Sequence, residues 1–524
     1  MVPLAPLLVA ALLLQFTLPS AEAIRTAPTF APGERVVATH YFYWYRFSDS
    51  HFDALSLHFL DERAVSFESE AWHLREMRDV RAAGIDVVLP VYWGAVDHYE
   101  KPDVAFSVKG LPPLVAALDA MAGAGETPPR VGLFYDTTTL LNDVRGAAPA
   151  GGRADLRTEA GRDVFYRTIR DFFRMIPERH WARIGGRPLV VLYSAAFAAG
   201  HDQRTFDELA ARFARDFDGL RPFVVRDVSW ANAGTEASTA WGAALNGPEI
   251  HDGAAQIGPG YDDSPVPGRT TPIRDREDGR FYEQSWRAAL ASGRDLVLVE
   301  TWNEHHEGTS IAETREFGRR YIEITARYAA LFKSRATVAD DIVLAHPEPR
   351  PRPDLSWGAE AKGASVASYV AGTPATGGLR PVDNEDGRFE IVAAPDETPA
   401  IASTSAGPAY LYFQVSDWFA LDVRADFDLE IDFLDAGRGA LLVEYDSWNA
   451  GATLRGAYTV AGRIERRGTA AWRTERLTLA GARLANRQNA GADFRLSVAG
   501  GGERAIVRGI RIRRRARRRS GVFK

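Results

Sequence analysis

The chain has 524 residues, of which 46% are hydrophobic and 25% charged, a globular composition that excludes overall disorder and leaves room for more than one domain. Its 63 basic and 69 acidic residues give a net charge of −6, without the basic excess typical of nucleic-acid binding. The sequence contains no cysteine, which excludes disulfides, thiolate metal sites and cysteine nucleophiles.

Residues 1–23 have the pattern of a secretory signal sequence. An apolar run, Leu7–Leu14, precedes Pro19, and Ala21 and Ala23 match the small-residue pattern of a cleavage site. The apolar run is too short to span a membrane, so no stable membrane insertion is expected. We therefore predict cleavage after Ala23 and a secreted or periplasmic mature protein. An apolar anchoring tail is the other interpretation of this segment.

Residues 35–340 alternate short apolar runs with stripes of helical period. One stripe contains Phe165, Ile169 and Phe172, spaced as on one face of a helix. Parallel strands that are buried on both faces appear as continuous apolar runs, so eight runs alternating with helices predict a (β/α)8 TIM barrel. An open doubly wound sheet is the alternative, but no glycine-rich dinucleotide motif follows the first strand. The strands are expected at Val36–Tyr45, Asp86–Trp93, Val131–Tyr135, Leu189–Tyr193, Phe223–Val228, Trp241–Leu245, Ala254–Ile257 and Leu296–Thr301.

A proline-rich segment, residues 341–356, marks the end of the barrel pattern and predicts a stiff, extended linker. Beyond it, apolar residues alternate with polar ones, as in residues 429–433, and short turns rich in glycine separate the runs. This period of two predicts an all-β, jelly-roll-like sandwich over residues 357–515. Residues 516–524 form a basic tail, for which a solvated end and attachment to an anionic polymer both remain open.

Aromatic and acidic side chains cluster where the predicted barrel strands end. The first strand ends in the run His40–Tyr45, the second in Tyr92 and Trp93, and the third in Tyr135 and Asp136. Reactive groups of such barrels lie at the carboxyl ends of the strands. Aromatic faces suit the C–H faces of sugars, and carboxylates accept hydrogen bonds from hydroxyls. The pattern therefore favours a saccharide partner, although packing within the barrel explains any single aromatic residue equally well.

Glu304 and Glu307, after the eighth predicted strand, are the strongest candidates for catalysis. A spacing of three on a tight loop or a first helical turn places both side chains on one face. Cleavage of a glycosidic bond needs one carboxyl to protonate the leaving oxygen and a second that is ionised. Two carboxylates that lie this close are expected to differ in pKa, because they do not both ionise easily.

Other chemistries fit the same residues less well. His305, His306 and Glu307 resemble part of a metal site, but there is no His-Glu-x-x-His motif, and adjacent histidines usually point apart. A Ser-His-Asp hydrolase would need a Gly-x-Ser-x-Gly elbow, which does not occur. We expect no metal and no cofactor, and we expect an oligo- or polysaccharide as the partner. The sequence leaves the oligomeric state open.

The segment 303–311, NEHHEGTSI, resembles the Asn-Glu-Trp-His-Glu-Gly-Thr-Gln-Ile motif of glycoside hydrolase family 99, the endo-α-mannosidases and endo-α-mannanases. Residues 258–263 are similar to the Pro-Gly-Tyr loop of that family, and residues 84–94 to its second strand. The resemblance extends from Val36 to Lys333. The sandwich lies outside it and resembles appended carbohydrate-binding modules only in its expected fold.

This resemblance implies a barrel that cleaves α-glycosidic bonds with retention of configuration. It implies that Glu307 is the general acid/base and that Glu304 helps the 2-hydroxyl of the substrate to form a 1,2-anhydro sugar. Further residues are implied to contact sugar or to hold the two acids: Tyr43, Trp44, Trp93, Asp136, Tyr261, Asn303 and His306. His305 and Ser310 depart from the family motif, and Asp136 stands where the family carries a glutamate, so the sugar and its linkage stay open.

Two alternatives to a hydrolase remain at this point. One is a non-catalytic glycan-binding or envelope protein that uses the same rim of aromatic residues. The other is a polysaccharide-assembly protein of the transferase type, because barrels of that group share an Asn-Glu-Trp-x-Glu-Gly version of the motif. His306, Thr309 and the expected export signal favour the hydrolase.

Overall fold

The computed structural model describes residues 30–94, 105–141, 152–269, 271–336, 349–384, 387–404, 410–499 and 504–515. The predicted signal sequence, the basic tail and residues 341–348 of the predicted linker lie outside the described residues. The chain forms two compact units. The first contains the residues up to Pro267 together with Arg274–Glu348, and the second contains Gly268–Ile273 together with the residues from Pro349 onwards.

In the described part of the first unit, eight parallel strands form a ring. β1 pairs with β2 on one side and with β11 on the other, and neighbouring strands follow the order of the chain. A parallel bridge between Ser238 and Gly253 completes the ring between β8 and β10. The predicted (β/α)8 barrel is therefore confirmed. The strands are β1 (Val36–Tyr41), β2 (Val87–Tyr92), β3 continued by β4 (Arg130–Val131 and Leu133–Tyr135), β6 (Arg187–Leu192), β7 (Phe223–Asp227), β8 (Ala237–Thr239), β10 (Ala254–Ile257) and β11 (Leu296–Val299).

The predicted strand Trp241–Leu245 is wrong. The sixth strand of the barrel is the shorter β8, and residues Ala243–Asn246 form the helical turn α7 instead. Gly242, which precedes α7, has a φ of 106° that a strand cannot accommodate. Two-residue strands also flank the ring: β5 (Arg183–Ile184) pairs antiparallel with β6, and β9 (Glu249–Ile250) pairs antiparallel with β10.

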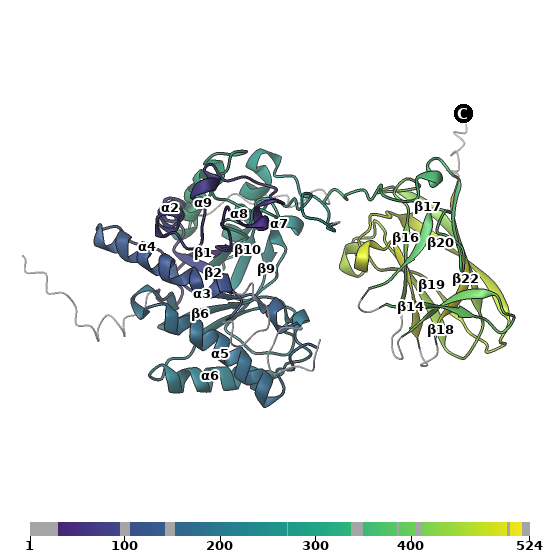
Figure 1. The fold of residues 1–524 in the computed structure, drawn as a ribbon, viewed down its shortest axis with the longest axis horizontal. Coiled ribbons are helices and arrows are strands. Elements are labelled where there is room, and N and C mark those ends of the chain that lie inside the picture. The colour runs from purple at the N-terminus through teal and green to yellow at the C-terminus, as the bar shows by residue number, and fades with distance from the viewer. Residues whose placement is uncertain are drawn as a thin grey trace, which may run out of the picture. The chain divides into compact units, whose positions relative to one another are not determined.

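Helices cover the outside of the ring (Figure 1). On α5 the predicted stripe of Phe165, Ile169 and Phe172 is buried, and α6 begins with a capping box in which the Asp202 side chain accepts the Thr205 N–H at 3.1 Å. None of the described helices has the length and apolar character needed to cross a membrane. The helices are α2 (Glu70–Ala82), α3 (Ala105–Lys109), α4 (Leu111–Gly123), α5 (Glu159–Met175), α6 (Gln203–Asp216), α7 (Ala243–Asn246), α8 (Arg280–Ala291) and α9 (Arg320–Lys333).

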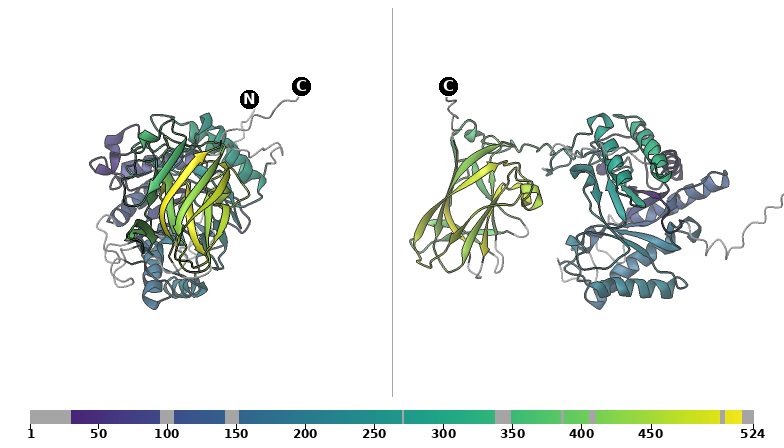
Figure 2. Two further views of the ribbon diagram at one scale, coloured as in Figure 1. Left: turned by 90° about the vertical axis from the view of Figure 1, so that its right-hand side faces the viewer. Right: turned by 180° about the vertical axis from the view of Figure 1, so that it is seen from behind.

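The second unit is a sandwich of two antiparallel sheets, as predicted, and Figure 2 shows its strands from two further sides. The apolar residues of 429–433 point inward and the acidic ones outward, and Phe413 and Phe494 of the other sheet stack at 5.2 Å in the core. The first sheet contains β12 (Val366–Val370), β14 (Phe389–Ala393), β15 (Pro399–Ser403), β17 (Ala425–Leu434), β20 (Trp472–Ala482) and β22 (Ile506–Arg514). The second contains β13 (Leu379–Val382), β16 (Tyr410–Val415), β18 (Ala440–Tyr445), β19 (Thr459–Glu465) and β21 (Phe494–Ala499).

The arginine-rich sequence before residue 516 is part of this sandwich. β22 pairs along its length with β17, and Arg511 forms an ion pair with Glu430 at 2.9 Å. Arg515 pairs in the same way with Asp428 at 2.6 Å. Arg511 on β22 and Arg515 directly after it therefore both have acidic partners on β17.

Candidate active site

The motif 303–310 lies on the loop that follows β11, and residues 305–308 form a turn rather than a helix. The buried side chain of Arg276 binds the backbone of this loop. Its Nη2 donates to the carbonyl oxygens of Gly308 and Ser310, each at 2.7 Å. A buried guanidinium bound to two carbonyls fixes the backbone that carries both glutamates.

Gly308 lets this turn lie directly against the preceding strand-end loop. Its φ is +59°, and a Cβ atom on Gly308 would lie 2.9 Å from the carbonyl oxygen of Asp262. The N–H of Asp262 in turn donates to the carbonyl oxygen of Glu307 at 2.9 Å. The loop after β10 therefore fixes the position of Glu307.

Glu304 is buried, and its two carboxylate oxygens have different surroundings. Oε1 accepts hydrogen bonds from the Tyr45 hydroxyl at 3.2 Å and from the His306 N–H at 2.9 Å, and Nδ1 of His306 lies 3.1 Å away. Oε2 is buried as well, but no described residue donates to it. Because an unpaired buried carboxylate oxygen is costly, this atom is suited to accept a hydroxyl of a ligand.

Tyr45 is the main contact of Glu304 outside the motif. Its hydroxyl also accepts the N–H of His305 at 2.9 Å, and its ring stacks on His306 at 5.4 Å. Burial, followed by the negative charge of Glu304, raises the pKa of Tyr45 well above its ordinary value. The phenol therefore stays protonated and remains a hydrogen-bond donor to Glu304.

Four of the predicted sugar-binding residues form one group beside Glu304. Trp44 lies edge-on to His306 at 6.3 Å and to Trp93 at 5.8 Å, measured between ring centroids. The indole N–H of Trp93 donates to Oδ2 of Asp136 at 2.7 Å. Trp44 and Trp93 are only partly buried, so they present aromatic surface at the ends of the first and second barrel strands.

Glu307 is less buried than Glu304. Burial, followed by the charges of Asp136 and Glu307, raises the pKa of Tyr193, which comes directly after β6. The two glutamates of the motif therefore have distinct surroundings. Glu304 contacts Tyr45 and His306, whereas the charge of Glu307 reaches Tyr193.

Aromatic side chains close the barrel beneath these acids. Trp241 stacks on Phe134 at 5.5 Å with an angle of 10° between the rings, and it meets His40 at 5.0 Å and Phe42 at 6.4 Å. Phe42 also contacts Trp44 at 4.9 Å. A continuous floor of rings therefore connects the two sides of the site.

The other predicted residues have mainly supporting positions. Tyr43 is fully buried and donates its hydroxyl to the Ser107 carbonyl at 2.8 Å, among residues that lie outside the ring of strands. Its place is thus in the packing around the barrel and not in a cleft. Asn303 accepts the N–H of Phe42 at 2.8 Å, and Tyr261 donates to Asp263 at 3.0 Å, so both brace loops around the acids.

Three residues of the site were missed from the sequence: Tyr45, Tyr193 and Trp241. Tyr45 belongs to the aromatic run that continues past the end of β1, where the regular alternation of strand side chains no longer applies. Tyr193 was assigned only to a strand, and Trp241 to a strand that does not form. Position at the end of a barrel strand was the signal that could have identified Tyr193.

The described residues contain no group of three or more His, Asp or Glu side chains arranged to hold a metal ion. His305 is buried against Phe59, with 3.9 Å between the ring centroids, whereas His306 faces Tyr45 and Trp44. Burial lowers the pKa of His305 to about 3, which keeps this ring neutral.

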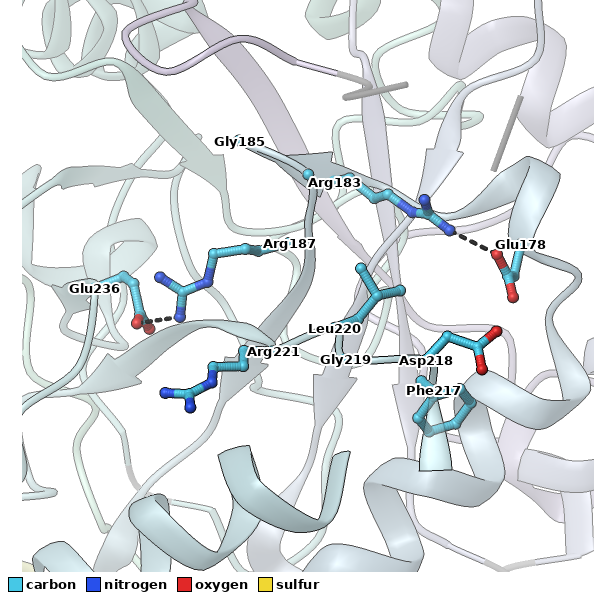
Figure 3. A pocket seen from close by; sticks show the side chains of 11 residues that line it. Glu178, Arg183, Gly185, Arg187, Phe217, Asp218, Gly219, Leu220, Arg221 and Glu236 are labelled. Carbon is cyan, nitrogen blue, oxygen red and sulfur yellow. Dashed lines mark hydrogen bonds and ion pairs between the residues drawn. The ribbon is translucent and has the colours of Figure 1, made fainter. Parts of the chain in front are cut away.

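A pocket of about 640 Å³ lies elsewhere on the barrel, where β6 and β7 begin (Figure 3). Arg183 pairs there with Glu178 at 2.9 Å, and Arg187 pairs with Glu236. Active sites of such barrels lie at the opposite, carboxyl ends of the strands. We therefore do not place the candidate site in this pocket, where arginines pair with Glu178 and Glu236.

Trp302, next to Asn303, is held by a buried acid on α2. Its indole N–H donates to Oε2 of Glu76 at 2.7 Å, and burial raises the pKa of Glu76 to about 7. Because the folded-state pKa lies above the ordinary value of 4.5, Glu76 contributes stability below about pH 4.5. This contribution is lost as the pH rises from there through about 7.

We therefore expect Glu76→Gln to become progressively more stable than the wild type as the pH rises from about 4.5 to about 7, with a constant difference above that. Each pH unit in this range changes the difference in stability by up to about 1.4 kcal/mol. Glutamine is the suitable replacement because its side-chain oxygen still accepts the indole N–H but carries no charge to bury. Urea unfolding at unit steps from pH 5 to pH 8 measures the difference. Glu283→Gln, on the outside of α8, serves as control, and a difference that does not change with pH would contradict the prediction.

Residues 26–340 match a family model that is described as a domain of unknown function, DUF5010. The chain belongs to this family. The match extends over the barrel, and the description of the family names no activity.

Curated relatives connect the barrel with known enzymes. A glycoprotein endo-alpha-1,2-mannosidase of Mus musculus is 35% identical over 101 residues, which cover 16% of this chain and 22% of that protein. A glycoprotein endo-alpha-1,2-mannosidase-like protein of Danio rerio is 44% identical over 55 residues, or 10% of this chain and 12% of that protein. The chain thus spans less than a quarter of the length of these relatives. The resemblance to endo-α-mannosidases is confirmed, and in sequence the chain is similar to glycoside hydrolases.

A solved structure of the family 99 endo-alpha-mannosidase from Bacteroides thetaiotaomicron aligns with 17% identity and a TM-score of 0.42. The alignment covers 58% of this chain and 98% of the other. At that identity and score it says nothing about activity.

Proposed function

We propose that this chain is an exported retaining glycoside hydrolase that cleaves α-linked, mannose-containing glycans. The observation that carries the proposal is Glu304, a buried carboxylate with one oxygen held by Tyr45 and His306 and the other without a donor. Glu307 lies on the same turn, and the partly exposed Trp44 lies beside His306 of that turn. The similarity to endo-alpha-1,2-mannosidases supports an α-mannoside as the substrate.

In the proposed reaction Glu304 takes the proton of the substrate 2-hydroxyl, whose oxygen attacks the anomeric carbon. Glu307 donates its proton to the leaving glycosidic oxygen, and the bond to that oxygen breaks as the 1,2-anhydro sugar forms. Water then opens the anhydro ring at the anomeric carbon, giving a proton to Glu307 while Glu304 returns one to the 2-oxygen. Two inversions at one carbon give net retention of configuration.

The proposal also includes export of the protein and binding of carbohydrate by its sandwich domain. Residues 1–23 would direct secretion or transport to the periplasm, and the sandwich would bind carbohydrate. Incubation of the full chain with α-mannans, with the products followed by NMR, tests the hydrolase. Release of oligosaccharides whose new reducing ends first form as the α-anomer is expected. Absence of release from all α-mannans, or a requirement for a nucleotide sugar, would overturn the proposal.

We expect Tyr45→Phe to lower kcat/KM on α-mannan by about 10- to 100-fold, because Glu304 loses a hydrogen bond that orients it. Tyr43→Phe is the matched control. Tyr43 is equally buried and lies two residues away, but its hydroxyl bonds to Ser107, away from the acids. This control should lose about 1 kcal/mol of stability and keep its activity within about twofold. Equal losses of activity in the two variants would remove Tyr45 from the site.

A further inference from the structure

Trp241 has a position that its role in closing the barrel does not fully explain. One face of its ring stacks on Phe134, yet the side chain stays partly exposed at the ends of the strands. Trp230, by contrast, is completely buried in the barrel core. The exposed part of Trp241 is thus available to a ligand.

Two buried carboxylates hold the backbone on either side of this ring. Oδ2 of Asp227, at the end of β7, accepts the backbone N–H of Trp241 at 3.0 Å, and Oε1 of Glu300 accepts the backbone N–H of Gly242 at 2.8 Å. Glu300 also accepts the Ala244 N–H at 3.0 Å. The proposed reaction uses neither acid. Their hydrogen bonds instead fix the direction in which the Trp241 ring projects.

Two further aromatic residues extend the surface of Trp241. Tyr193 lies edge-on to it at 5.3 Å, and Phe197 stacks on Tyr193 at 5.9 Å. Both are partly buried. Tyr193 follows β6 and Trp241 follows β8, across the ring from β1 and β11, which precede Trp44 and His306. Aromatic surface therefore flanks the acids on both sides.

We infer that Tyr193, Phe197 and Trp241 form a leaving-group platform, which binds the sugar unit that departs when the glycosidic bond breaks. The inference rests on the proposed hydrolase function, in which Glu307 protonates the oxygen of that unit. Aromatic faces pack against the C–H face of the sugar, and the Tyr193 hydroxyl and the indole N–H of Trp241 offer hydrogen bonds to its hydroxyls. The substrate class is a glycan that continues beyond the scissile bond on both sides.

Two substrates separate the platform from the rest of the site. In α-1,2-linked mannotetraose a sugar leaves, whereas in α-mannobiosyl fluoride only a fluoride ion leaves, which is too small to contact the platform. We expect Trp241→Ala to lose about tenfold more in kcat/KM on mannotetraose than on the fluoride, mainly through KM. Trp241→Phe should recover most of the loss, because a ring for stacking remains. Equal losses on both substrates, or none on either, would overturn the platform.

Binding measurements distinguish a failed platform from a failed hydrolase. Calorimetry with mannotetraose compares the full-length Glu307→Gln protein with the same protein carrying Trp241→Ala. A weakening of about tenfold upholds the platform even where the wild type releases no sugar, which would count against the hydrolase alone. Equal affinity of the two proteins overturns the platform. Absence of binding to the Glu307→Gln protein counts against both the platform and the function.

Discussion

Replacement of Glu307 by glutamine should reduce kcat/KM on α-mannan by about 10³-fold or more while glycan binding is retained. Glutamine fills nearly the same volume but carries no proton for the leaving oxygen and takes none from water. The backbone of the turn should persist, because Arg276 and Asp262 hold it through carbonyl oxygens and not through this side chain. Assays of reducing ends measure the activity, and calorimetry with mannotetraose measures the binding.

Glu283→Gln provides the control for charge removal. Glu283 lies on α8 and pairs with Arg327 outside the barrel, so its variant should match the wild type in activity. A Glu307→Gln protein that hydrolyses α-mannan within about tenfold of the wild-type rate would exclude Glu307 as the acid/base. A variant that loses both activity and binding would indicate damage to the loop instead.

Glu304→Gln is expected to have a loss of similar size for a different reason. The glutamine oxygen can replace Oε1 and keep the hydrogen bonds from Tyr45 and His306. Its amide nitrogen then stands where Oε2 has no donor, and an amide nitrogen cannot take the proton of the 2-hydroxyl. We expect kcat/KM on α-mannan to fall by about 10³-fold.

The fluoride substrate separates the two roles. Fluoride leaves without a proton, so in the first turnover Glu307→Gln should recover at least about tenfold of its loss on α-mannobiosyl fluoride. Glu304→Gln should recover nothing, because attack by the 2-hydroxyl is still needed. Rapid-mixing measurements of fluoride release provide the comparison. Recovery by both variants would contradict the assigned roles.

The barrel could be predicted because its signals are local. Buried parallel strands need continuous apolar runs, and helices that cover them need stripes such as Phe165, Ile169 and Phe172, so seven of the eight strands were placed within a few residues. The exception is β8, whose three residues form too short a run to be detected. The motif around Glu304 and Glu307 could also be recognised from the sequence, because its residues are adjacent in the chain.

The end of the first barrel strand shows a side-chain placement that the sequence could not predict. Its aromatic run extends past β1, and Tyr43 and Tyr45 look alike in the sequence. In the structure Tyr43 packs outside the ring, whereas Tyr45 reaches Glu304, more than 250 residues later in the chain. The direction of the backbone after the strand decides between them, and no local pattern reports it.

Trp241 is the clearest case of a residue placed by distant parts of the chain. It was expected within a strand, yet hydrogen bonds to Asp227 and Glu300 turn its backbone into α7 and bring its ring over Phe134. Periodicity and motif alone predicted the barrel, the sandwich and the two candidate glutamates, because each prediction depends on residues that are near neighbours in the chain. The unpaired oxygen of Glu304 and the ring of Trp241 depend on contacts between strand ends that are far apart in sequence, and such contacts exist only after the ring has closed.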